Sequence, residues 1–191
     1  MPNDLYPSAV VNHTGNVKIN AQSRDQEAFG VYVHSAKPNK ESGTDQGGAA
    51  NFSKELNIKA VSANSNATGI FVSGAPITDE NGEVLFTSGQ ASVNTSGDTT
   101  IVAAGKTASY ALNAEADGQI TVGSTGKTVH LTGDIVAKND GVINIAGKTN
   151  TINGIVKAVD GGTVNLSGAS DAVYNNININ SFVTQGTGSN G

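Results

Sequence analysis

The feature that most constrains the fold of this sequence is internal repetition. The tripeptide Gly-Lys-Thr occurs three times with an even, unbroken spacing, at 105–107, 126–128 and 147–149. Strand-like segments that begin with glycine recur in the same region, at 118–122, 141–145 and 162–166. A repeat length near 20 is typical of solenoids, in which each repeat buries its apolar face against its neighbours. The repetition therefore predicts a repeat protein.

The glycine-opened segments alternate between apolar and polar residues, which predicts strands that are buried on one face. In the middle segment, Ile143 and Ile145 fall on the inner face, and Val142 and Asn144 fall on the outer face. The other two segments give inward pairs Ile120/Val122 and Val164/Leu166, and outward pairs Gln119/Thr121 and Thr163/Asn165. We expect each Gly-Lys-Thr to be the turn after such a strand.

Two further apolar runs complete each repeat. The second run ends in a bulky apolar residue, Leu131 or Ile152, and Val173 follows at the same spacing as the tripeptides. The third run aligns Ile135/Ala137 with Val156/Ala158 and Ile177/Ile179. Three short strands in a coil of about 21–23 residues predict an all-β parallel β-helix. A leucine-rich repeat would need a helical arm, and the glycine-rich nonapeptides of calcium-binding β-rolls are absent from the sequence.

Composition limits the partners that this chain can bind. The net charge is −5 and Arg24 is the only arginine, which argues against nucleic acid or an anionic membrane as a partner. No stretch of 18 apolar residues is present, so we do not expect this segment to span a membrane. Cysteine is absent, which excludes disulfides and thiolate metal sites.

The whole chain, 1–191, is predicted to be one elongated domain of roughly eight coils. An older duplication aligns 17–21 with 56–60 and 28–33 with 67–72, both at one and the same offset. The duplicated segments are further apart than the Gly-Lys-Thr copies. We attribute the additional residues to a polar loop inserted at about 36–54. A second irregularity at 75–81 contains Pro76 and leads into a strand over 83–87. A frayed tail is expected at about 185–191, because this stretch is rich in glycine and serine.

Several of these motifs together resemble the passenger domains of Gram-negative autotransporter adhesins and the related hemagglutinin-type secreted adhesins. The motifs are the small–aromatic/Thr–Gly–β-branched–aromatic pattern of 28–33 and 67–72, the run Ala-Asp-Gly-Gln-Ile-Thr-Val at 116–122, and the strand at 162–168. The resemblance extends over roughly residues 15–184. It implies a right-handed β-helix that is secreted to the bacterial cell surface and attached to the outer membrane through a region outside this sequence.

The same resemblance implies a non-enzymatic adhesin that acts in attachment, self-association or biofilm formation and in virulence. The expected partners are a host-surface protein or glycan, or another copy of the chain. No cofactor, metal or catalytic residue is expected. The alternative function is a β-helical polysaccharide lyase or glycoside hydrolase, because these enzymes also use β-helices.

Motifs that suggest catalysis have simpler explanations. A phosphate-binding loop needs a glycine five residues before Gly-Lys, where this chain has Thr100, Thr121 and Val142. The acids of a lyase or hydrolase must gather in one groove. The aspartates at 98, 117, 134, 140 and 160 instead stand mostly beside glycine at predicted turns. His130 is expected to point outward between Val129 and Leu131, and His13 and His34 lie far from it in sequence.

Four residues are candidates for a binding surface. Tyr32 and Phe71 are equivalent in the older duplication, and they stack outside the fold if Val31, Val33, Ile70 and Val72 fill the interior. The opposite register would put both rings in the core, and a third possibility is that they lie beneath the 36–54 loop. Asn144 and Asn165 are matched outward positions. They form either a self-association surface or an ordinary soluble sheet face.

Overall fold

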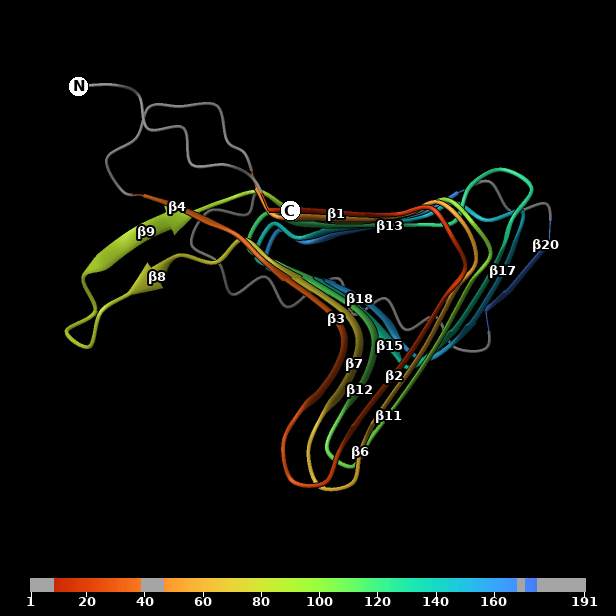
Figure 1. Ribbon diagram of the computed structural model, residues 1–191, viewed down its shortest axis with the longest axis horizontal. Coiled ribbons are helices and arrows are strands. Elements are labelled where there is room, and N and C mark those ends of the chain that lie inside the picture. The colour runs from red at the N-terminus through yellow and green to blue at the C-terminus, as the bar shows by residue number, and fades with distance from the viewer. Residues whose placement is uncertain (1–8, 39–46, 168–170, 175–191) are drawn as a thin grey trace.

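The computed structural model describes residues 9–38, 47–167 and 171–174, and in these residues the chain is all-β (Figure 1). The chain passes from the first of three parallel sheets to the second, then to the third, and then returns to the first. One strand from each sheet makes one repeat. This order is consistent with the predicted β-helical solenoid.

Successive repeats supply neighbouring strands of every sheet. The first sheet contains β1 (Val10–His13), β5 (Ala49–Phe52), β10 (Ala91–Thr95), β13 (Gly118–Val122), β16 (Val142–Ile145) and β19 (Thr163–Leu166). The second contains β2 (Val17–Ser23), β6 (Leu56–Ser62), β11 (Thr99–Gly105), β14 (Thr128–Thr132), β17 (Thr149–Asn153) and β20 (Asp171–Tyr174). The third contains β3 (Ala28–His34), β7 (Ala67–Ser73), β12 (Ser109–Glu115), β15 (Asp134–Lys138) and β18 (Val156–Val159).

The interior is a narrow column of aliphatic side chains. Each sheet contributes one stacked row at paired positions: Val93–Ile120–Ile143 from the first sheet, Ile58–Ile101–Leu131–Ile152 from the second, and Ile70–Leu112–Ile135–Val156 from the third. Every one of these side chains is buried. The predicted inward placement of Ile120 and Ile143 is confirmed. Small and medium side chains suit this column because the facing sheets leave little width between them.

The repeat length is not uniform. Along the first sheet, Asn12 pairs with Asn51 at a separation of 39 residues, and Asn51 pairs with Asn94 at a separation of 43. Later steps shorten to 23 residues from Thr121 to Asn144, and to 21 from Asn144 to Asn165. The predicted coil length therefore holds for the last repeats only. Within the described residues, the first sheet contains six strands.

The extra residues of the two long repeats lie at one corner, between the third and first sheets, where they pair with each other. β4 (Ala36–Pro38) and β8 (Ile77–Thr78) both flank β9 (Val84–Ser88) in an antiparallel sheet that projects from the solenoid, here called the arm (Figure 1). The prediction of a loop over 36–54 is therefore wrong at both ends of the range. The first residues form β4 in the arm, and β5 near the other end belongs to the first sheet. Residues 39–46 and the predicted tail at 185–191 lie outside the described residues.

The Gly-Lys-Thr tripeptides are not all equivalent. The copies at 126–128 and 147–149 both precede second-sheet strands, where Thr128 pairs with Thr149. The copy at 105–107 begins with the last residue of β11, and there the Lys106 backbone N–H donates to the carbonyl of Ser65. The expectation that all three mark the turn before the second strand is therefore wrong for the first copy. The cause is a difference in the length of the corner between the first and second sheets. Thr99 follows Asn94 by five positions, whereas Val129 follows Thr121 by eight, and these residues are their strand partners in the next repeat.

The predicted step from Ile152 to Val173 in the second sheet is also wrong. Val173 pairs with Thr151, and Ile152 pairs with Tyr174, so the last step in the second sheet is one residue longer than expected. A slip of one residue moves a side chain to the opposite face of a strand. Val173 is accordingly 53% exposed. The predicted pair Ile177/Ile179 lies outside the described residues.

Candidate binding surfaces

The outer face of the first sheet carries a row of amide side chains at paired positions of successive strands. The row consists of Asn12, Asn51, Asn94, Thr121, Asn144 and Asn165, and is here called the asparagine row. These residues point outward because the residues beside them, such as Ile143 and Ile145, are buried in the column. The predicted outward placement of Asn144 and Asn165 is confirmed, and their role in binding stays a prediction.

Hydrogen bonds join the amides along the row. Asn51 Nδ2 donates to Asn12 Oδ1 at 2.9 Å, and Asn94 Nδ2 donates to Asn51 Oδ1 at 3.0 Å. At the other end, Asn165 Nδ2 donates to Asn144 Oδ1 at 2.8 Å. An amide has two donor hydrogens and two acceptor lone pairs, so each bond along the row leaves further capacity directed at solvent. The row therefore presents polar groups at the strand spacing of about 4.8 Å.

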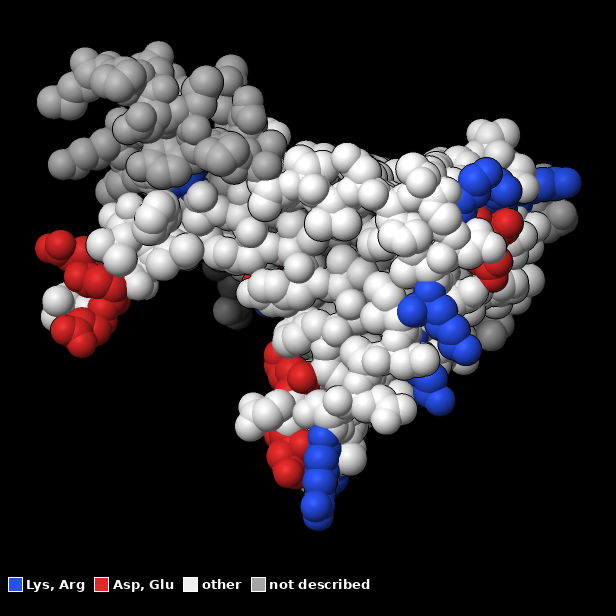
Figure 2. All heavy atoms as spheres, viewed as in Figure 1, with Lys and Arg blue, Asp and Glu red and all other residues white. Residues whose placement is uncertain are grey.

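The face around this row carries no charged side chain in the described strands. The second outward row of the same sheet consists of Val10, Ala49, Ser92, Gln119, Val142 and Thr163. In Figure 2 the first sheet is seen edge-on along the upper boundary, which is white until the corner at the right, where cations and anions gather. A flat uncharged amide surface can approach a second surface without desolvating ions, which lowers the cost of contact.

An aromatic cluster occupies the outer face of the third sheet. Tyr32 pairs with Phe71, and their rings stack with centroids 5.1 Å apart and an interplanar angle of 15°. Phe29 lies edge-on to both rings, at 5.2 Å from Tyr32 and 5.7 Å from Phe71. The flanking residues Val31 and Ile70 are buried. The rings are therefore outside the column, as one of the sequence hypotheses has it, and Tyr32 is 55% exposed.

Glycine makes the aromatic cluster possible by bending the third sheet. Phe29 and Tyr32 are three residues apart, yet both lie on the outer face because Gly30 is left out of the pairing. Gly69 occupies the same place in β7, where an added Cβ atom would overlap Ile101 Cγ2 and would lie 2.6 Å from the carbonyl oxygen of Ala111. A side chain at Gly69 would therefore clash unless its neighbours shift, although Ala111 occupies the equivalent place in β12.

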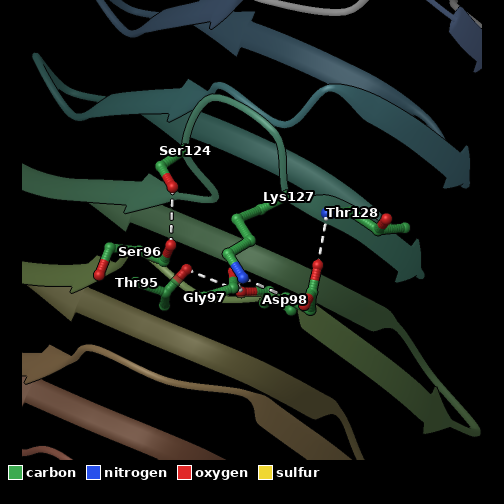
Figure 3. A network of polar contacts seen from close by, with 8 residues as sticks. Thr95, Ser96, Gly97, Asp98, Ser124, Lys127 and Thr128 are labelled. Atoms are coloured by element: carbon green, nitrogen blue, oxygen red, sulfur yellow. Dashed lines mark hydrogen bonds and ion pairs between the residues drawn. The ribbon is translucent and has the colours of Figure 1, made fainter.

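A polar network fixes the corner before β14 (Figure 3). Asp98 Oδ1 accepts the backbone N–H of Thr128 at 2.8 Å, and Asp98 Oδ2 lies 3.6 Å from Lys127 Nζ. The Thr128 hydrogen bond is the main cause that holds the pKa of Asp98 below its usual 3.8, and the charge of Lys127 adds to it. Ser124 Oγ also donates to the carbonyl of Ser96 at 2.7 Å. Lys127 therefore binds a carboxylate of the preceding repeat.

The other aspartates mark turns or accept backbone hydrogen bonds. Asp117, Asp140 and Asp160 have positive φ values, so the turn role predicted for them is confirmed. Asp134 lies at the start of β15 and accepts the backbone N–H of Ile155 at 3.0 Å. His130 is exposed between the buried Val129 and Leu131, as predicted. Within the described residues, no three His, Asp or Glu side chains are placed to hold a metal ion.

Sequence reasoning missed four residues of these surfaces: Asn12, Asn51, Asn94 and Phe29. The duplication that aligns 17–21 with 56–60 also aligns Asn12 with Asn51, so extending it toward the N-terminus would have found that pair. Asn94 was hidden because its separation from Asn51 includes the arm. Phe29 was missed because strict alternation puts residues three apart on opposite faces, and only the bend at Gly30 reverses this.

No family model, curated protein or solved structure matches the chain. The described part of the chain contains no helix with the length and apolar character needed to cross a membrane.

Proposed function

We propose that this chain is a segment of a bacterial cell-surface adhesin, the passenger of an autotransporter, folded as a right-handed parallel β-helix. The observation that carries this proposal is the asparagine row, in which five amides and one hydroxyl repeat along a single uncharged face. In a rigid solenoid these groups keep a fixed spacing. Attachment or self-association then results from many weak contacts made together, which strengthens binding without any single strong site.

The placement of the acids favours adhesion over hydrolysis. A hydrolase needs two carboxyl groups that face each other across the substrate, about 5 to 10 Å apart and free to exchange protons. Glu115 and Asp134 on the third sheet are instead paired with lysines: Lys138 Nζ lies 2.6 Å from Glu115 Oε2, and Lys157 Nζ lies 3.8 Å from Asp134 Oδ2. Asp117 and Asp140 belong to turns.

The proposal is tested by placing charge on the asparagine row. The double variant Asn94→Asp/Asn144→Asp keeps the shape of both side chains. A carboxylate at 144 still accepts the hydrogen bond from Asn165 Nδ2, whereas the hydrogen bonds that Asn94 and Asn144 donate to Asn51 and Thr121 are lost. We expect bacteria that display this variant to lose the clumping or host-cell attachment that the unmodified segment confers. The matched control is Asn139→Asp/Asn153→Asp, which changes two exposed asparagines outside the first sheet.

The readout is the settling rate of a bacterial suspension together with the number of bacteria retained on a cell layer. Display level is matched by antibody staining. Attachment and clumping that survive the double substitution, or that fall equally in the control, would remove the asparagine row as the adhesive surface.

A further inference from the structure

The arm is the main exposed apolar feature of the described structure that the proposed function does not use. Four of its large hydrophobic side chains are exposed: Ile77 41%, Val84 41%, Leu85 50% and Phe86 37%. In Figure 1 the arm projects sideways from the corner between the third and first sheets, away from the column. Exposed apolar side chains gathered on one projection indicate a contact surface.

The arm also differs in charge from the rest of the molecule. Residues 75–90, which contain β8 and β9, include Asp79, Glu80 and Glu83 and no lysine or arginine. Asp79 is engaged in the turn, where its Oδ1 accepts the backbone N–H groups of Asn81 and Glu83, both at 2.8 Å. Glu80 and Glu83 are exposed. Lys37, on β4, pairs in the backbone with Thr87. Figure 2 shows the resulting red tip at the left.

A surface of opposite charge lies on the far side of the molecule, on the outer face of the second sheet. The nine outward positions of β2, β6 and β11 are Lys18, Asn20, Gln22, Asn57, Lys59, Val61, Thr100, Val102 and Ala104. They include two lysines, two valines and no acid. Lys18 and Lys59 are exposed. Lys54 and Arg24 extend the positive charge at the two ends of this face.

The acids near this basic face lie outside its nine outward positions, and they accept hydrogen bonds from neutral amides. Glu55 Oε1 accepts Asn57 Nδ2 at 2.7 Å. Asp25 and Glu27 stand at the corner toward the third sheet, where they accept the side-chain amides of Asn64 and Asn66. The nine outward positions themselves carry two positive charges and no negative one, beside aliphatic side chains. This combination of charge and apolar surface complements the acidic, apolar arm.

We infer that the arm docks on the second-sheet face of another copy of this chain, with Glu80 and Glu83 beside Lys18 and Lys59. The two surfaces lie on opposite sides of one molecule, so an arm cannot reach the face of its own chain (Figure 2). The contact joins two different surfaces, and such heterologous contacts extend into open rows of molecules. The inference rests on the adhesive role proposed above and identifies the partner as a second copy, but it does not use the asparagine row.

The test is sedimentation velocity of the purified chain, at low and at high salt, combined with charge reversal. We expect the chain to self-associate at low salt, and we expect added salt to weaken the association because exposed charges are screened. Glu80→Lys/Glu83→Lys and Lys18→Glu/Lys59→Glu should each weaken self-association by about tenfold or more. An equimolar mixture of the two variants should associate again, because the reversed arm then meets the reversed face.

Two further variants keep the result interpretable. Lys106→Glu/Lys148→Glu makes the same change in net charge as Lys18→Glu/Lys59→Glu, but at two exposed turn lysines, and should leave association intact. Leu85→Ser should weaken association without reversing any charge. Circular dichroism and melting temperature establish that each variant is folded.

A wild-type chain that stays monomeric at low salt overturns the inference, and so do folded variants that fail to associate when mixed. The result is separable from the adhesive role of the asparagine row, because Asn94→Asp/Asn144→Asp should leave association through the arm unchanged.

Discussion

Lys127 Nζ lies 3.6 Å from Asp98 Oδ2, and this ion pair ties the corner before β14 to the corner of the preceding repeat. The same carboxylate accepts the backbone N–H of Thr128. A lysine that by sequence suggests a nucleotide site thus has a structural role. Both side chains are about half exposed, at 44% and 52%, so the pair is screened by solvent.

Replacement of Asp98 by asparagine tests the energetic value of this pairing. Asparagine keeps an acceptor for Thr128 but removes the charge. Because the folded-state pKa of Asp98 is lowered, its stabilising effect is complete above the unfolded value of 3.8 and is lost as pH falls through the folded-state pKa. We expect Asp98→Asn to lower the free energy of unfolding at pH 7 by about 1 kcal/mol or less.

Urea unfolding at pH 7 and at pH 3 measures this difference. The gap between wild type and variant should narrow at pH 3, and high salt should narrow it at pH 7. Asp117→Asn is the control, because asparagine also tolerates the left-handed backbone at that turn. An equal gap at both pH values would contradict the assigned role of the charge.

The Gly-Lys-Thr tripeptides show how far the sequence predicts this fold. Strand alternation correctly identified Ile120, Ile143 and Asn144, because face assignment depends only on local period. Corner lengths were not predicted, because a solenoid tolerates insertions at its turns. The copy at 105–107 matches the spacing by coincidence, whereas the copies at 126–128 and 147–149 stack.

Gly69 provides a test of the bend in the third sheet. An added Cβ atom would overlap Ile101 Cγ2 and would lie 2.6 Å from a backbone oxygen. The backbone oxygen cannot move aside cheaply, so we expect Gly69→Ala to lower the free energy of unfolding by about 1–3 kcal/mol. Gly82→Ala in the arm is the comparison, because it strains a positive φ but meets no atom within 4 Å.

Thermal and denaturant unfolding distinguish the two glycine variants. Gly69→Ala should shift the unfolding of the whole column, whereas Gly82→Ala should leave that transition near the wild-type position. Wild-type stability in Gly69→Ala would show that the sheet relaxes around the methyl group and that glycine is not required there.

Asn150 is a buried polar residue that the sequence pattern did not identify as buried. It lies at an inward position of β17, opposite Val129, and it is fully buried. Neither its Oδ1 nor its Nδ2 has a hydrogen-bond partner. The residue type alone does not tell an outward asparagine from an inward one. The pairing of its strand with the neighbouring strands does. Alternation predicts the face but not whether a polar group there is satisfied.

Replacement of Asn150 by valine should therefore stabilise the protein. Valine already occupies the neighbouring inward position, at Val129. Removing an unsatisfied buried amide recovers about 1–3 kcal/mol, which urea unfolding at pH 7 measures directly. Asn153→Val, at an exposed position of the same strand, should have little effect. A destabilised Asn150→Val variant would indicate that the amide makes hydrogen bonds to buried water.

The turn of the arm depends on Asp79, and its removal should affect the arm alone. The Asp79 carboxylate accepts two backbone N–H groups, and the hydrogen bond from Glu83 is the main cause that lowers its pKa. Asp79→Ala leaves both N–H groups to water and loosens the β8–β9 connection. We expect limited proteolysis to cut within 79–83 faster in Asp79→Ala than in the wild type, while the melting temperature of the column stays unchanged.

The control Asp79→Asn removes the charge but keeps a hydrogen-bond acceptor. Its cleavage rate should therefore fall between those of the wild type and Asp79→Ala. A lowered melting temperature in Asp79→Ala would instead show that the arm and the column unfold together.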